Sequence, residues 1–168
     1  MQFFDYTIDW CKGEIFEARI ILIFGIIAII CAIMFWKTGS TANAKAMFYP
    51  LLITGILFSS IGIGMLFKNN ERMEEFARSY YDNKTTFVKA EKERTEGFIG
   101  WYPITFKIAA ALIIIGLALT LFWSSALGRA IGLTLMLIGL VTFFVDHFSE
   151  ERAAIYHQKI VEELTTNN

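Results

Sequence analysis

Four long apolar runs, separated by charged and turn-forming segments, dominate this 168-residue chain. They extend over residues 20–36, 46–67, 103–123 and 126–148. A helix rises about 1.5 Å per residue and the hydrocarbon core of a bilayer is roughly 30 Å thick, so each run is long enough to cross. The first run has no polar face, which a helix of a soluble protein would keep. We therefore predict an all-α polytopic membrane protein, with four transmembrane helices in a single bundle domain.

The segment before the first run, residues 1–18, has a helical pattern of its own. Phe4, Ile8, Cys11 and Ile15 recur at helical spacing, with charged residues placed away from them. This pattern predicts an amphipathic helix at the membrane interface, turned into the first span at Gly13. Amphipathicity alone does not distinguish the lipid surface from the helical bundle as the surface on which this helix lies.

Two further segments predict helical extensions of the bundle. Residues 68–97 indicate a cytoplasmic helical loop that is interrupted around residues 82–83 and ended at Gly97. Residues 149–168 indicate a cytoplasmic C-terminal helix. This last helix either starts afresh at Ser149, a favourable capping residue, or continues the fourth span without a break.

Lysine and arginine are distributed unevenly on the two sides of the spans. Lys37, Lys45 and Arg129 are in the two short loops, which leaves twelve of the fifteen on the side of both termini and the middle loop. By the positive-inside rule, both termini are expected in the cytoplasm, in a bacterial inner (plasma) membrane. All sixteen acidic residues share that side, so there is no concentrated basic patch of the kind that binds nucleic acid.

The two halves of the chain share short features. Phe-Trp ends the first and third runs, at residues 35–36 and 122–123, and Glu-Arg follows the second and fourth, at 71–72 and 151–152. The Tyr-Pro pairs open the second and third runs instead and do not follow this repeat. A duplicated hairpin and a chance recurrence of common membrane residues both fit the sequence.

Small residues at helical spacing mark the second and fourth runs. In membranes such residues let helix backbones approach closely, either within a bundle or between copies of a chain. The candidate helix-packing or oligomer-contact residues are Gly55, Ser59, Ser60, Gly62, Gly64, Gly128, Gly132 and Gly139.

Candidate chemistry is sparse. No ionisable residue lies near the middle of a run, which argues against ion-coupled transport. Asp146, His147 and Glu151 form a candidate polar site at the inner end of the fourth run, but they lack the H-E-x-x-H spacing of a common zinc site. We therefore predict no catalytic residue, no metal site and no cofactor.

These features favour a non-catalytic integral membrane protein that acts through protein–protein contacts. Such a protein would be an accessory or regulatory subunit, or an immunity protein against a membrane-active toxin. Its expected partners are the lipid bilayer and either another membrane protein or further copies of itself. The alternatives are an oligomeric pore or carrier for a small neutral or apolar solute, and a lipid-modifying enzyme that uses the inner-boundary residues.

Overall fold

The structure is a computed structural model that describes residues 3–166, and the regular structure in this range is entirely helical. The prediction of an all-α fold is therefore confirmed. The helices are α1 (Phe3–Thr38), α2 (Ala42–Ala46), α3 (Phe48–Asp82), α4 (Lys84–Ile99), α5 (Tyr102–Phe122) and α6 (Ala126–Thr166).

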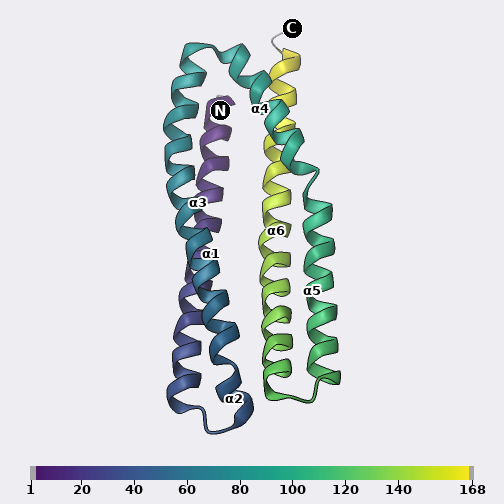
Figure 1. Ribbon diagram of the computed structural model, residues 1–168. Coiled ribbons are helices and arrows are strands. Elements are labelled where there is room, and N and C mark those ends of the chain that lie inside the picture. Colours follow the sequence, from purple (N-terminus) through teal and green to yellow (C-terminus); the bar gives the residue numbers. More distant parts are fainter. Residues whose placement is uncertain (1–2, 167–168) are drawn as a thin grey trace.

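Two long helical hairpins stand side by side (Figure 1), one made of α1 and α3 and the other of α5 and α6. The short helix α2 lies in the turn of the first hairpin, and α4 connects the hairpins at the end where both termini lie. Four segments of the described chain are long and apolar enough to cross a membrane: Phe3–Thr38, Ala42–Asp82, Lys84–Phe122 and Ala126–Thr166. This confirms the prediction of four helices with transmembrane character.

The first helix differs from the prediction. α1 is continuous through Gly13, so there is neither a turn at this residue nor a separate surface helix over residues 1–18, of which 1–2 lie outside the described range. A Cβ atom on Gly13 would lie 2.7 Å from Nε of Arg152 in α6 and 2.8 Å from its Cδ. A side chain of α6 therefore occupies the space beside Gly13, and a larger residue here would require the Arg152 side chain to move. Tertiary packing outweighs the weak helix propensity of one glycine, which is about 1 kcal/mol.

The loop between the hairpins is helical, with one break. α3 continues to Asp82, and the side chain of Asn83 then caps α4 by accepting a hydrogen bond of 3.0 Å from the Thr86 backbone N–H. The break lies where the sequence indicated it, whereas α4 ends at Ile99, two residues beyond Gly97. α6 has no break at Ser149, so the C-terminal segment is an extension of the same helix; residues 167–168 lie outside the described range.

Small residues are placed where the two helices of a hairpin approach each other. Gly55 and Gly62 of α3 lie against α1, beside Gly25 and Ala18 respectively, while Gly132 and Gly139 of α6 lie against α5. Of the other candidate packing residues, Ser59 lies beside Gly25 and Gly128 lies against Trp123. Ser60 is exposed and donates a hydrogen bond to the Ile56 carbonyl. Nothing lies within 4 Å of a Cβ atom built on Gly64. The glycine contacts thus join helices within each hairpin.

Candidate functional site

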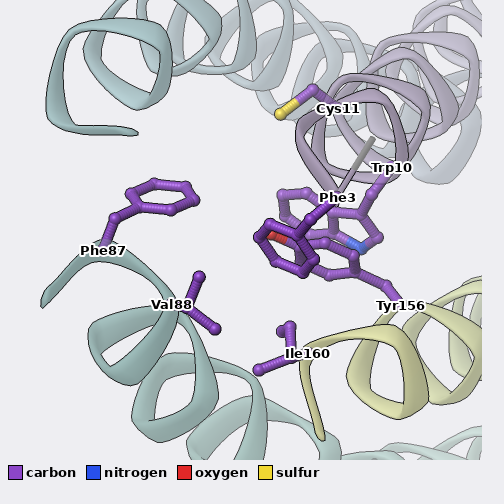
Figure 2. Packing of buried hydrophobic residues seen from close by; sticks show 7 residues of the cluster. All are labelled: Phe3, Trp10, Cys11, Phe87, Val88, Tyr156 and Ile160. Atoms are coloured by element: carbon purple, nitrogen blue, oxygen red, sulfur yellow. The ribbon is translucent and has the colours of Figure 1, made fainter. Parts of the chain in front are cut away.

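A cluster of large side chains holds α1, α4 and α6 together at the end of the molecule that carries both termini. We call it the head cluster; its buried members are Phe3, Trp10, Cys11, Phe87, Val88, Tyr156 and Ile160. Figure 2 shows the rings of Phe3, Trp10 and Tyr156 lying together, with Val88 and Ile160 beside them. The Trp10 and Tyr156 rings stack with centroids 5.5 Å apart. Such aromatic burial is among the strongest contributions to packing outside the membrane.

A buried polar network crosses the head cluster. Glu91 of α4 is only 3% exposed, and its two carboxylate oxygens accept hydrogen bonds from Nε and Nη2 of Arg94, both of 2.7 Å. The Tyr156 hydroxyl of α6 lies 2.8 Å from Glu91 Oε2 and 3.1 Å from the hydroxyl of Thr7 in α1. Burial, and then the charge of Glu91, raise the pKa of Tyr156 well above its usual range. Tyr156 therefore stays protonated and links three helices.

The guanidinium of Arg94 is also packed between aromatic rings. It lies 4.4 Å from the centroid of the Trp10 ring and 5.2 Å from that of Phe98. A desolvated cation over an aromatic face is held more strongly than one in water. Cys11, beside this group, is fully buried, and burial raises the pKa of its thiol to about 11, so it is not a nucleophile at neutral pH.

A second ionic cluster joins the two hairpins just below the head cluster. Arg152 of α6 bonds to Glu17 of α1 and lies 3.5 Å from Glu14 Oε1. Glu17 is 8% exposed, and it precedes the first apolar run by three residues. Burial, and then the neighbouring charge of Glu14, raise the pKa of Glu17 to about 7, although Arg152 and Ser149 oppose this shift. One cation therefore faces two carboxylates at the end of the apolar runs that is nearer to both termini.

The raised pKa of Glu17 predicts that stability decreases with rising pH. An unfolded glutamate has a pKa of 4.5 and the folded one about 7, so between these values the folded state binds more protons. Stability is then highest below this window, falls as pH rises through it and levels off above it. We expect the detergent-solubilised protein to melt at a higher temperature at about pH 5.5 than at about pH 8.

The variant Glu17→Gln isolates this effect. We expect it to be more stable than the wild type at about pH 8, by on the order of 2 kcal/mol, and to lose much of the pH dependence. Glu75→Gln, which removes an exposed carboxylate from α3, is the matched control and should follow the wild-type profile. Identical pH profiles for all three proteins would contradict the assignment to Glu17.

The three residues of the polar site predicted from the sequence, Asp146, His147 and Glu151, differ in their exposure to solvent. Asp146 is partly buried, and its Oδ2 atom has no hydrogen-bond partner in the described chain. His147 and Glu151 are exposed, and the His147 ring lies beside Phe148. Within residues 3–166, no group of three or more His, Cys, Asp or Glu side chains is arranged to hold a metal ion.

The sequence analysis did not single out the two clusters that join helices near the end of the molecule that carries both termini. The sequence predicted residues 68–97 as a helical loop without a buried face, yet Glu91 and Thr95 of α4 are buried with Phe87 and Val88. A usable signal was present, because residues 87, 88, 91 and 95 form one helical stripe with an acid inside it. The partner of Glu17 is 135 residues away, and no local pattern reveals such a pair.

No protein-family model, no curated protein and no solved structure matches the chain. The arrangement itself is what bears on function. Glu91 bonds to Arg94 on its own helix and to Tyr156 of α6, and Arg152 of α6 bonds to Glu17 of α1, so these contacts connect α1, α4 and α6.

Proposed function

We propose that this chain is a non-catalytic integral membrane protein that acts through protein–protein contacts, as an accessory or regulatory subunit or as an immunity protein. The observation that carries the proposal is that its buried ionisable groups form ion pairs and hydrogen bonds with other side chains of the chain. Glu91 bonds to Arg94 along α4 and to the Tyr156 hydroxyl of α6, and Glu17 of α1 bonds to Arg152 of α6. Ionisable groups that bond in this way stabilise the arrangement of the helices, and the outer surfaces of these helices are then available for contacts with a partner protein.

The distribution of lysine and arginine supports a bacterial inner-membrane location with both termini in the cytoplasm. In this orientation the head cluster stands on the cytoplasmic side, beyond the apolar runs. The extensions of α1, α3 and α6 then form a helical platform that a cytoplasmic or membrane partner can reach.

An apolar groove lies between the two hairpins, among the apolar runs. It encloses a cavity of about 340 Å³ between α3 and α6, lined by Tyr49, Pro50, Ile53, Thr54, Leu127, Ile131, Thr134, Leu135 and Ile138. The polar members are small, and Thr134 already donates to the Ala130 carbonyl. A transmembrane helix of a partner protein can insert its apolar side chains here by van der Waals packing, which drives helix association in lipid.

Photocrosslinking in native membranes tests the proposal. A photoreactive amino acid replaces Ile53, which lines the groove and is 65% exposed, or Ile114 of α5, which is 67% exposed and is outside the groove. We expect one discrete protein adduct from position 53 that is absent from position 114. When the adduct partner has been identified and is reconstituted with the purified chain, the same adduct should form again from position 53. An adduct with a second copy of the chain would indicate self-association. Lipid adducts alone at both positions would contradict a contact function for this groove.

A further inference from the structure

A second furrow runs between α1 and α6 and crosses the inner boundary of the apolar runs. Its lower part is a cavity of about 460 Å³ lined by Phe16, Glu17, Ile20, Phe144, Val145, Phe148 and Arg152. Its upper part is a cavity of about 200 Å³ lined by Tyr6, Asp9, Trp10, Arg152, Ile155 and Tyr156. Arg152 lines both cavities, so they are neighbouring parts of one furrow.

The furrow changes character along its length. On α1 its lining residues fall on one helical stripe between Tyr6 and Ile20, which corresponds to roughly 21 Å at helical rise. The lower cavity is apolar apart from Glu17 and Arg152, and the upper cavity combines aromatic rings with Asp9 and Arg152. An apolar lower end below a charged middle matches a molecule with a hydrocarbon chain and a polar head.

Two buried donors in the furrow have no acceptor in the described chain. They are the indole Nε1 of Trp10 and the Nε of Arg152. Trp10 is only 6% exposed and lines the upper cavity, so its N–H group is shielded from bulk water. A buried donor without a partner is costly, and an anionic oxygen is the strongest acceptor that such a donor can find. A phosphate oxygen is an acceptor of this kind.

The carboxylates at the same level favour a cation as well. Glu14 and Glu17 share the single guanidinium of Arg152, which leaves one excess negative charge when both are ionised. Burial disfavours the ionised form of Glu17, and a nearby cation would offset that cost. A primary ammonium suits the position because it offers three N–H donors, whereas a trimethylated ammonium offers none.

We propose that the furrow between α1 and α6 binds one glycerophospholipid with an ethanolamine-type headgroup. The phosphate lies at Arg152 and Trp10, the ammonium at Glu17 and Glu14, and an acyl chain lies in the lower cavity. This site is independent of the proposed protein-contact groove, which lies between α3 and α6. Gly13 is part of the site, because it lets the Arg152 side chain lie against α1.

Native mass spectrometry of the full chain in mild detergent tests this proposal. The protein is incubated with equal amounts of phosphatidylethanolamine and phosphatidylglycerol, and the retained lipids are counted. We expect one retained phosphatidylethanolamine, favoured over phosphatidylglycerol by about tenfold. Equal retention of the two lipids, or retention of neither, would overturn the proposal.

Three variants locate the site. Ile20→Trp fills the lower cavity from a position that is 42% exposed, and we expect it to lower retention by about tenfold. Ile27→Trp is the matched control, because Ile27 is 52% exposed on the same helix and does not line the furrow; retention should not change. Glu17→Gln should keep binding but lose the preference for the amine headgroup. This conservative variant keeps the test valid if Ile20→Trp does not fold. Equal retention by the two tryptophan variants, or an unchanged preference in Glu17→Gln, would refute the assignment.

Discussion

Replacing Arg94 by methionine is expected to lower the stability of the protein by about 3–5 kcal/mol, because it leaves a buried carboxylate without its counter-charge. Glu91 is 3% exposed, and both of its carboxylate oxygens are bonded to Arg94. The substitution keeps a long apolar stem but removes the cation stacked on Trp10. A change of this size corresponds to a fall in melting temperature of roughly 10 °C for a chain of this length.

The same helix supplies the matched control. Lys92 and Glu96 of α4 form an exposed pair with an N–O distance of 3.6 Å, so Lys92→Met should cost less than about 1 kcal/mol. The double variant Glu91→Leu, Arg94→Met removes both buried charges and should recover much of the loss. Equal destabilisation by Arg94→Met and Lys92→Met would show that the buried pair does not stabilise the head cluster.

Cys11 provides a direct readout of this unfolding. Its side chain is fully buried in the head cluster, and the other cysteine, Cys31, lies within the first apolar run. In a Cys31→Ser background, a fluorogenic thiol reagent reacts only when the head cluster opens. The melting curve then reports the region in which the ion pair lies, whereas total helix content would also report the membrane-embedded helices.

The transmembrane helices could be predicted from the sequence because the bilayer restricts which segments can cross it. A bilayer requires each span to satisfy its own backbone hydrogen bonds and to present apolar side chains, so composition over about 20 residues is enough to find a transmembrane helix. The Asn83 break was predictable for a similar reason, because an asparagine cap between two charged helical segments is a local signal. Both features depend on residues that are close together in the sequence.

The features that were missed depend on residues far apart in the sequence. Gly13 indicated a turn by its residue type, but it lies within a continuous helix and packs against Arg152, 139 residues later. Glu91 is one of many charged residues in the predicted helical loop and was not singled out, but Tyr156 and Arg94 bond to it inside the head cluster. The sequence predicted a polar site at the end of the fourth apolar run, formed by Asp146, His147 and Glu151. The ionic contact between the hairpins is instead made by the next residue after Glu151, Arg152.

Gly55→Leu is expected to destabilise the first hairpin by about 1–3 kcal/mol or more, because the added side chain has no space. A Cβ atom at this position would lie 2.6 Å from Ile29 Cγ1 and 2.8 Å from both the Gly25 carbonyl oxygen and the Ile29 nitrogen. Two of these three atoms belong to the backbone of α1, so the helices must move apart to relieve the overlap. Close approach of helix backbones is what small residues permit in a membrane.

Gly64→Leu is the matched control on the same helix, because nothing lies within 4 Å of its Cβ position. Leucine forms helix better than glycine by up to about 1 kcal/mol, so this variant should be as stable as the wild type or more stable. Melting of the two variants in the same detergent measures the difference. A loss of stability at Gly64 equal to that at Gly55 would mean that both glycines are tightly packed, and that α3 makes a further contact at Gly64, such as one with a second copy of the chain. A loss at Gly55 alone assigns the small residues of α3 to packing within the hairpin, where they hold α1 against α3 and thereby fix the α1 face that carries Gly13, Glu17 and Ile20.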